Sequence, residues 1–315
     1  MQIVILDGYA ANPGDLSWDA LRAFGTVSVY DRTPAEFAAQ RMRGADVVFT
    51  NKTKIGAVQL ATAGNLRFIG VLGTGYDVVD TAAARSRGVT VCNVPGYSTD
   101  AVAQLTMALL LEICHHTGHH DREVHKGRWT YAADYCFWDY PLIELSGLTF
   151  GVLGTGSIGC RTARIAEAFG MRVIGCSRSE RKEFCGTYVS FPELLAQADV
   201  LSLHCPATPE TVNIINADAL SKMKSTAILL NTARGTLVNA QDLADALNED
   251  RLYAAGIDVA EREPIARSNP LLGAKNCVIT PHIAWAPQAA RKRLLAASAE
   301  NLAAFLAGKP IHCVN

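Results

Sequence analysis

Residues 148–178 read LTFGVLGTGSIGCRTARIAEAFGMRVIGCSR, and the rest of the chain is interpreted from this stretch. An apolar run over residues 149–153 leads into the turn GTGSIG at residues 154–159. A helical pattern follows over residues 161–169, and a second apolar run begins at Val173. In this order of strand, G-x-G-x-x-G, helix and strand, the glycine pattern indicates dinucleotide binding.

Each glycine of the turn has a separate physical role in that motif. Gly154 permits the tight turn, Gly156 lets the backbone approach a pyrophosphate, and Gly159 lets the helix pack closely on the strand. Ser157 and Ile158 lie at the start of the helix, where free N–H groups and the positive end of the helix dipole favour phosphate groups. We therefore expect these five residues to contact a dinucleotide.

The composition of the chain narrows the possible classes of protein. The chain has 315 residues, 49% of them hydrophobic, and a net charge of −1. The length favours two domains, and the absence of a basic or acidic tract argues against a nucleic-acid or anionic-membrane partner. No segment resembles a leader or a membrane span, and the nine cysteines show no C-x-x-C spacing. We therefore expect a cytoplasmic protein with reduced thiols.

Two series of alternating strands and helices organise the chain. The predicted strands are residues 3–6, 27–30, 47–50, 68–71 and 90–94, then 149–153, 172–176, 200–204, 227–231, 255–259 and 277–280. This alternation predicts an α/β fold with two doubly wound parallel-sheet domains, one flavodoxin-like and one of the Rossmann type.

The chain is expected to return to its first domain near its end, because a helix predicted over residues 289–307 follows the last strand of the second series. Residues 1–97 and 287–315 would then form a discontinuous substrate-binding domain, and residues 98–286 the dinucleotide-binding domain. The ligand cleft would lie between them, at the carboxyl ends of the second sheet.

A long helix is predicted from Ser98 or Thr99 to His116, with apolar residues on most faces, which is typical of a helix buried between domains or subunits. His115, His116, His119 and His120 cluster at its end. No Cys or carboxylate completes a zinc-like spacing, so we interpret them as a polar helix end rather than a metal site.

Three polar residues follow strands of the second series. They are Arg234, Glu263 and His282. Each alone is better explained without a functional role, Arg234 as a surface ion, Glu263 as a loop carboxylate and His282 as a helix-capping group, because most polar loop residues are simply solvated. Together at one sheet edge they form a coherent set, because a guanidinium grips a carboxylate by two hydrogen bonds, an imidazole transfers protons near neutral pH, and a carboxylate fixes the imidazole tautomer.

At these residues the sequence resembles the D-specific 2-hydroxyacid dehydrogenase family, over essentially the whole chain. The family places its glycine turn in the middle of the chain, as here. Two further segments resemble the glycerate dehydrogenase, or hydroxypyruvate reductase, branch. The segments that carry the resemblance are residues 154–159, 230–235, 258–264, 281–285 and 73–77, and those that favour the branch are residues 12–18 and 138–142.

The resemblance implies roles for individual residues in an NAD(P)-dependent conversion of hydroxypyruvate or glyoxylate to D-glycerate or glycolate. Arg234 would anchor the substrate, His282 would be the acid–base group, and Glu263 would orient His282. The backbone around Thr74 and Gly75 would bind the substrate carboxylate. The cofactor contacts would be Gly154, Gly156, Ser157, Ile158, Gly159, Ser177, Arg178, Ser179, His204, Cys205, Pro206, Thr211, Thr232, Ala233, Arg234, Asp258 and His282.

Two further expectations concern the substrate and the oligomer. Lys52 follows a strand of the first domain and is equally well read as a substrate ligand or a solvated lysine. Family members are usually homodimers, and we expect the long helix and the loop around residues 129–141 in the interface.

The cofactor is expected to be NADP(H) rather than NAD(H). An NAD site normally has Asp or Glu at the end of the second strand, where it binds the ribose 2′-hydroxyl. Here Ser177 holds that position and is followed by Arg178 and Ser179, which suit a 2′-phosphate. Alternatively, Arg178 stacks on adenine or lies in solvent while Ser177 binds an unphosphorylated ribose.

Two other functions are compatible with the same scaffold. One is a non-catalytic, dinucleotide-sensing protein that binds a partner, like the family's transcriptional corepressors. The other is a phosphite-type dehydrogenase, which shares the three catalytic side chains. A formate enzyme is disfavoured, because those members have glutamine at the position of Glu263.

Overall fold

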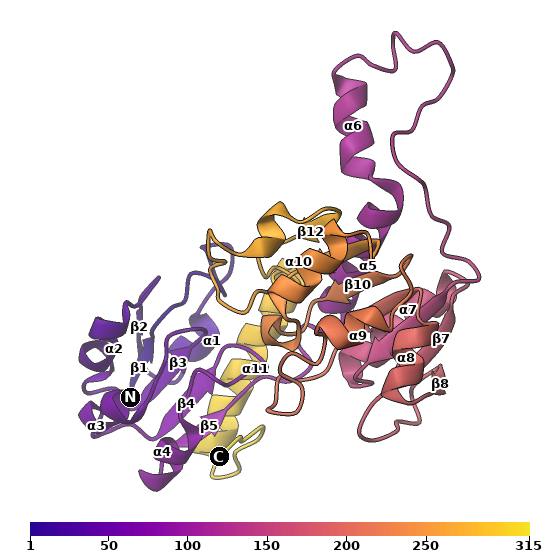
Figure 1. The fold of residues 1–315 in the computed structure, drawn as a ribbon. Coiled ribbons are helices and arrows are strands. Elements are labelled where there is room, and N and C mark those ends of the chain that lie inside the picture. The colour runs from indigo at the N-terminus through magenta and orange to yellow at the C-terminus, as the bar shows by residue number, and fades with distance from the viewer. The chain divides into compact units, whose positions relative to one another are not determined.

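The computed structural model describes residues 1–315, which divide into two compact units. Unit 1 comprises Met1–Ser98 and Trp285–Asn315, and unit 2 comprises Thr99–Ala284. Each unit has its own all-parallel sheet (Figure 1). The expected α/β fold with two parallel sheets is therefore confirmed.

The sheet of unit 1 has five strands in the order β2-β1-β3-β4-β5. This is the flavodoxin-like strand order, in which the direction of winding reverses between β1 and β3. The strands are β1 (Gln2–Ile5), β2 (Thr26–Val29), β3 (Val47–Thr50), β4 (Phe68–Val71) and β5 (Thr90–Cys92). The helices are α1 (Asp19–Arg22), α2 (Ala35–Met42), α3 (Ala57–Thr62), α4 (Thr81–Ser86) and α11 (Gln288–Leu306).

Burial in this sheet follows strand position. All residues of β3 and β4 are buried, as expected for central strands covered on both faces, whereas β2 at the edge is mostly exposed. Helix α11 packs on β4, where the rings of Phe68 and Phe305 lie 5.0 Å apart. The last 31 residues of the chain therefore belong to the unit that the first 98 residues begin.

The sheet of unit 2 has seven strands in the order β12-β11-β10-β9-β6-β7-β8. Its order reverses between β6 and β9, as in a Rossmann sheet. The strands are β6 (Thr149–Leu153), β7 (Arg172–Cys176), β8 (Thr187–Tyr188), β9 (Val200–Leu203), β10 (Ile228–Asn231), β11 (Ala254–Ile257) and β12 (Cys277–Ile279). The helices are α5 (Thr99–His115), α6 (Thr117–His125), α7 (Ser157–Ala168), α8 (Phe191–Gln197), α9 (Ala217–Ser221), α10 (Ala240–Asn248) and the 3₁₀ turns η1 (Gly235–Leu237) and η2 (Pro270–Gly273).

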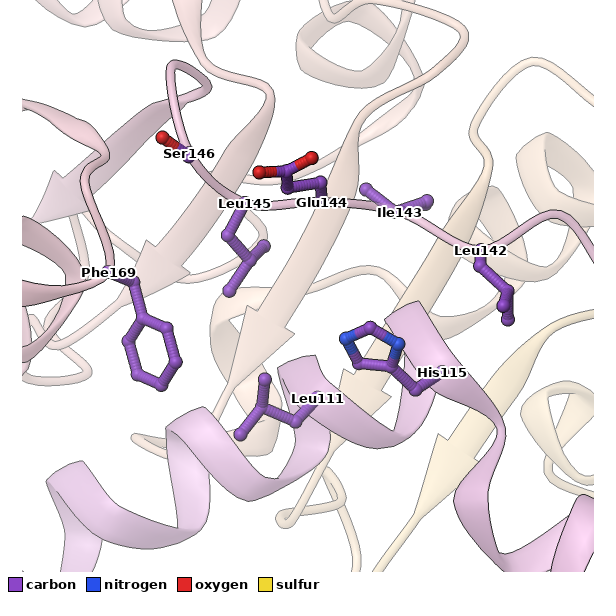
Figure 2. A pocket seen from close by; sticks show the side chains of 8 residues that line it. All are labelled: Leu111, His115, Leu142, Ile143, Glu144, Leu145, Ser146 and Phe169. Carbon is purple, nitrogen blue, oxygen red and sulfur yellow. The ribbon is translucent and has the colours of Figure 1, made fainter.

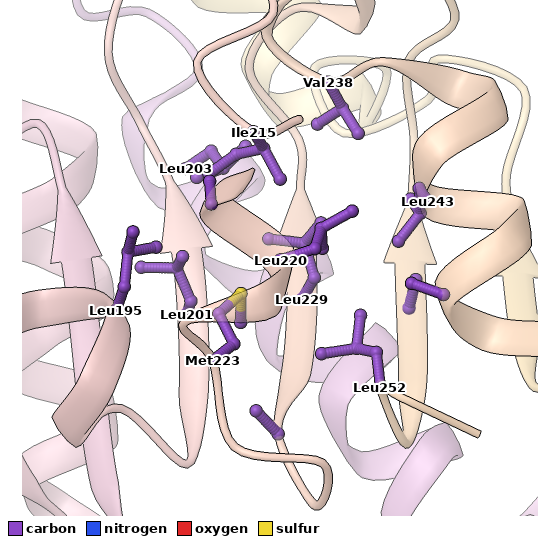
Figure 3. Packing of buried hydrophobic residues seen from close by; sticks show 14 of the residues in the cluster. Leu195, Leu201, Leu203, Ile215, Leu220, Met223, Leu229, Val238, Leu243 and Leu252 are labelled. Atoms are coloured by element: carbon purple, nitrogen blue, oxygen red, sulfur yellow. The ribbon is translucent and has the colours of Figure 1, made fainter. Parts of the chain in front are cut away.

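Both faces of this sheet are covered by apolar packing. Leu201 and Leu229 belong to a core with residues of α8, α9 and α10 (Figure 3). Their neighbours Val200 and Ile228 belong to a second core with residues of α5 and α7. Successive side chains of a strand alternate between faces, so fully apolar strands are what a sheet with two covered faces requires.

The predicted strands are found with ends that differ by at most two residues, but strand β8 and helix α6 were missed. Strand β8 has only two residues, too few for a recognisable pattern. Helix α6 begins at Thr117, directly after His116, whose φ of 48° ends α5. The histidine cluster therefore spans a break between two helices, and its reading as one polar helix end is corrected. No group of three or more metal-binding side chains occurs there.

Helix α6 and the chain that returns from it extend away from the sheet of unit 2 (Figure 1). We call residues 117–147 the arm. Its aromatic side chains are largely exposed, with 88% of Tyr131, 88% of Tyr135 and 64% of Trp138 accessible to solvent. Asp139 anchors the arm internally, because it binds both Arg128 and, at 2.7 Å, Nε2 of His119. The contacts with Arg128 and His119 hold the pKa of Asp139 well below its usual range.

No helix of the chain is both long and apolar enough to cross a membrane.

Candidate active site

The glycine turn lies at the switch point of the unit 2 sheet, between the ends of β6 and β9. Gly154 has a φ of 97°, and a Cβ on it would meet the backbone nitrogen of Cys205 at 2.6 Å. A Cβ on Gly159 would meet the carbonyl oxygen of Gly154 at 2.1 Å. Both positions therefore require glycine for the turn and for the close packing of α7.

Gly156 differs from its two neighbours, because a Cβ placed on it would meet no atom within 4 Å. It precedes the first turn of α7, and no side chain caps that helix end. The leading N–H groups of a helix have no partners within the helix, so those of Ser157 and Ile158 face an open, electropositive space. These residues fit the pyrophosphate of a dinucleotide.

The end of β7 carries no carboxylate. Ser177 is half-buried there, and Arg178 and Ser179 are exposed. Glu210, in the loop after β9, lies near enough for Arg178 to contribute to lowering its pKa, although hydrogen bonding from Thr208 is the larger cause.

The loop after β9 borders the same switch point. His204 binds Ser202 through Nε2 at 2.8 Å, and burial lowers the pKa of His204 to about 4, so its ring is neutral at pH 7. Thr211 accepts the N–H of Thr208 at 2.7 Å and donates to the carbonyl oxygen of Pro206 at 2.8 Å. The hydroxyl of Thr211 thus closes the loop that contains Cys205 and Pro206.

Arg234 follows β10 on a turn that Asn231 holds. The amide of Asn231 donates to the carbonyl oxygen of Arg234 at 2.9 Å and accepts the N–H of Ala233 at 3.1 Å. The side chain of Thr232 is buried and bonds to Thr106 of α5 at 2.9 Å. The half-buried guanidinium of Arg234 donates to the carbonyl oxygen of Ala233 at 2.7 Å.

Asp258, which follows β11, is 1% exposed and organises the loop after β12. One carboxylate oxygen accepts Thr280 Oγ1 at 2.6 Å and the N–H of Ile283 at 2.9 Å, and the other accepts the N–H of Ala284 at 2.9 Å. Its carbonyl oxygen accepts the N–H of His282 at 2.8 Å. Both oxygens of this carboxylate are thus bound within the protein, where they position His282.

His282 and Glu263 form a direct pair. Nδ1 of His282 lies 2.7 Å from Oε2 of Glu263, and the other oxygen of Glu263 accepts the N–H of Ala260 at 3.1 Å. The two side chains are 25% and 32% exposed, so the ring remains accessible. Because β10, β11 and β12 are parallel neighbours, the loops that bear Arg234, Glu263 and His282 leave the same edge of the sheet.

Unit 1 carries the other predicted substrate residues, also at one sheet edge. Lys52 follows β3, and the backbone N–H groups of residues 51–53 all donate to the carboxylate of Asp7, which follows β1. This leaves the exposed Lys52 at the switch point of that sheet. Thr74 follows β4, and its hydroxyl donates to the carbonyl oxygen of Val94 at 2.9 Å.

Sequence reasoning missed the residues that support these loops. Asn231 is the last residue of β10, Asn93 follows β5 directly, and Asp7 lies two residues after β1. Asn93 donates from Nδ2 to the carbonyl oxygen of Thr74 at 2.7 Å. The signal that identified Arg234, a polar residue at the end of an apolar run, was also present at these three positions.

One pocket of unit 2 lies elsewhere (Figure 2). It is lined by side chains of α5, of the chain that leads into β6, and of the end of α7, including Leu111, His115, Leu145 and Phe169. These segments lie at the amino ends of β6 and β7. The pocket is therefore remote from the carboxyl edge, where open α/β sheets bind their ligands.

Residues 107–284 match the family described as D-isomer specific 2-hydroxyacid dehydrogenase, NAD binding domain. The chain is 51% identical to the hydroxypyruvate reductase of Blautia hydrogenotrophica over the full length of both chains. It is 37% identical to the glycerate dehydrogenase of Methylorubrum extorquens, over 90% of this chain and 89% of that one.

Solved structures agree with these sequence relationships. The NADPH-dependent glyoxylate/hydroxypyruvate reductase of Sinorhizobium meliloti superposes with a TM-score of 0.86 at 28% identity, covering 99% of this chain and 97% of that one. The chain belongs to the D-isomer specific 2-hydroxyacid dehydrogenases. It is an NAD(P)-dependent oxidoreductase whose substrates are small 2-keto and 2-hydroxy acids, which confirms the family and activity expected from the sequence.

Proposed function

We propose that the protein reduces hydroxypyruvate to D-glycerate and glyoxylate to glycolate, with Arg234, Glu263 and His282 as its catalytic residues. The observation that carries the proposal is the pairing of His282 with Glu263 at the sheet edge where Arg234 also emerges. The names of the relatives, hydroxypyruvate reductase and glycerate dehydrogenase, support the choice of substrate.

In this proposal Arg234 binds the carboxylate and keto oxygen of the substrate through two hydrogen bonds. The bound nicotinamide supplies the hydride. Nε2 of protonated His282 donates its proton to the keto oxygen as negative charge develops there. Glu263 holds Nδ1, which fixes the ring orientation and stabilises the protonated form. Positioning of this kind contributes roughly 7–11 kcal/mol to lowering a barrier.

We propose that the cofactor contacts are those expected from the sequence, with Asp258 acting through the loop it orders rather than by direct contact. Its carboxylate already accepts three hydrogen bonds from Thr280, Ile283 and Ala284. Gly156, Ser157 and Ile158 would hold the pyrophosphate, because they surround the open end of α7.

We infer a preference for NADP(H). Ser177, Arg178 and Ser179 replace the acid that normally binds an unphosphorylated ribose, and the Sinorhizobium relative is named as NADPH-dependent. Glu210 is the opposing feature, since its negative charge lies near enough to Arg178 for the two to interact electrostatically. The cofactor preference therefore depends on which anion Arg178 binds more strongly.

We further propose that the substrate carboxylate or hydroxyl meets Lys52 and the backbone of Thr74 and Gly75. The support is their position after neighbouring strands of the unit 1 sheet.

A second proposal is a homodimer in which the arm covers a partner subunit. Its support is the exposure of Trp129, Tyr131, Tyr135 and Trp138 on an arm that extends from its own unit (Figure 1).

Steady-state reduction of a substrate panel tests the proposed function. Hydroxypyruvate and glyoxylate should be turned over with much higher kcat/KM than phenylpyruvate or 2-ketoisocaproate, and phosphite should not be oxidised. A preference for a bulky keto acid would reject the proposed substrate. Absence of turnover with every substrate, with dinucleotide binding intact, would instead support the partner-binding alternative.

A further inference from the structure

Two thiols face each other within unit 1. Cys92 is the last residue of β5, and Cys313 lies in the short segment after α11. Their Sγ atoms are 3.6 Å apart, and the two residues form an antiparallel bridge although the sheet itself is parallel. The terminal segment thus pairs with the edge strand β5, and this pairing places Cys313 directly opposite Cys92.

The backbone holds these two cysteines in a geometry that a disulfide accepts. The N–H of Asn93 donates to the carbonyl oxygen of His312 at 3.2 Å, and the N–H of Val314 donates to that of Val91 at 2.9 Å. Flanking bonds of this kind define a non-hydrogen-bonded antiparallel pair, whose Cα atoms lie about 4.5 Å apart. Disulfides span Cα separations of about 4.4–6.8 Å, so side-chain rotation alone brings the sulfurs together.

The two sulfurs differ in access. Cys313 is exposed, whereas Cys92 is completely buried. Burial, reinforced by the neighbouring thiol, raises the pKa of Cys92 to about 12, so it is a thiol at neutral pH. A reagent in solution therefore reaches Cys313 first, and Cys92 lies directly behind it as a resolving thiol.

We propose that Cys92 and Cys313 form a redox-modification site, which a small soluble disulfide such as oxidised glutathione converts to an intramolecular cross-link. The thiolate of Cys313 attacks one sulfur of the oxidant, and one small thiolate leaves. Cys92 then attacks Sγ of Cys313, and its proton passes to the second small thiolate as that group leaves. The two protein thiols lose two electrons and two protons, and the oxidant is reduced to two thiols.

The cross-link changes how the terminal segment is held. In the reduced protein this segment is held without a covalent cross-link, by packing of Val314 on the unit 1 core and by hydrogen bonds. The side chain of Asn315 accepts the N–H of Val91 at 2.9 Å and donates to the carbonyl oxygen of Val89 at 2.7 Å. The disulfide fixes the segment to β5 and closes a loop that spans most of the chain, which restricts the unfolded state. The oxidised protein should therefore unfold at a higher temperature than the reduced protein.

Peptide mapping of the full chain tests the site without any activity measurement. The protein is equilibrated in mixtures of reduced and oxidised glutathione, free thiols are alkylated, and the digest is examined for a peptide that joins Cys92 to Cys313. The joined peptide should accumulate as the oxidised fraction rises and disappear after reduction. In parallel, the unfolding temperature should rise on oxidation.

Two variants separate this site from general oxidation. Cys313→Ser, at an exposed position, should abolish both the joined peptide and the rise in unfolding temperature. Cys136→Ser, in the arm, should leave both intact. The proposal is overturned if Cys313 carries only glutathione while Cys92 remains a free thiol, or if Cys313 joins a different cysteine. Both results are read from the native sequence, so they do not depend on the folding of a variant.

Discussion

Nδ1 of His282 lies 2.7 Å from Oε2 of Glu263, and this contact decides which ring nitrogen serves the substrate. With Nδ1 bound to the carboxylate, Nε2 is the nitrogen available for proton transfer. The backbone of His282 is fixed independently, since its N–H donates to the carbonyl oxygen of Asp258. Loss of either contact should therefore misplace the ring rather than unfold the domain.

The first prediction is that His282→Ala reduces turnover of hydroxypyruvate by roughly 10²- to 10⁴-fold, the usual contribution of one acid–base group. Dinucleotide affinity, measured by cofactor fluorescence, should change little because the glycine turn is untouched. His125→Ala serves as the matched control, since His125 is exposed at the end of α6. Near-normal turnover by the His282 variant would remove this residue from the mechanism.

The second prediction concerns Glu263→Gln, which keeps the shape of the side chain but removes its charge. The protonated imidazole loses a stabilising partner. His282 of the variant should therefore lose its proton at a lower pH than His282 of the native enzyme. The pH above which reduction declines should therefore move down, and this is read from kcat/KM profiles. Identical profiles for the variant and native enzymes would contradict the role of Glu263. Glu261→Gln, on the same loop, provides the control.

Much of this site could be predicted from the sequence, because the relevant residues follow apolar runs whose parallel pairing is strongly constrained. Gly154 and Gly159 could be assigned from the motif alone, and the structure shows why only glycine fits. The pairing of His282 with Glu263 depends on a loop of irregular backbone, for which no periodic pattern exists. The placement of both residues after strands of one sheet suggested that they meet, and the resemblance to a family assigned their roles.

Other features depend on tertiary contacts that are not visible in local sequence. The helix breaks at His116 because this residue has a left-handed backbone conformation. Gly or Asn usually marks such a position in a sequence, and neither is present here, so the break could not be predicted. The carboxylate of Asp7 binds backbone N–H groups of the loop that contains Lys52, and these groups lie 44 to 46 positions further along the chain. The bridge between Cys92 and Cys313 joins residues 221 positions apart, and it is antiparallel although the strands of the sheet are parallel.

The third prediction concerns stability at low pH. Asp15 binds Arg291 of α11 through two hydrogen bonds of 2.7 Å, and this pairing lowers the pKa of Asp15 from 3.8 to about 2. A depressed carboxyl pKa contributes stability that is complete above the unfolded value and is lost as the pH falls through the folded value. Native protein should therefore lose this contribution between about pH 4 and pH 2.

Asp15→Asn tests this assignment through thermal unfolding at several pH values. The variant should unfold at a lower temperature than the native protein at pH 7, and the two should converge as the pH approaches 2. Asp19→Asn is the matched control, because Asp19 pairs with Arg22 on an exposed surface, where such pairs contribute little. A difference between native and Asp15→Asn proteins that stays constant down to pH 2 would be inconsistent with the linkage.

The last prediction is that Arg178 determines cofactor preference. A charge-assisted hydrogen bond contributes roughly 1.5–3 kcal/mol, so Arg178→Ala should lower kcat/KM for NADPH by about tenfold to a hundredfold and leave that for NADH nearly unchanged. Glu210→Gln should act in the opposite direction, since it removes a negative charge that interacts with the same guanidinium. Arg251→Ala is the control, because Arg251 pairs with Glu249 on the surface beyond α10. The prediction fails if the enzyme prefers NADH and neither Arg178→Ala nor Glu210→Gln alters that preference. Ser177 and Arg178 would then not distinguish a 2′-phosphate from a 2′-hydroxyl on the ribose.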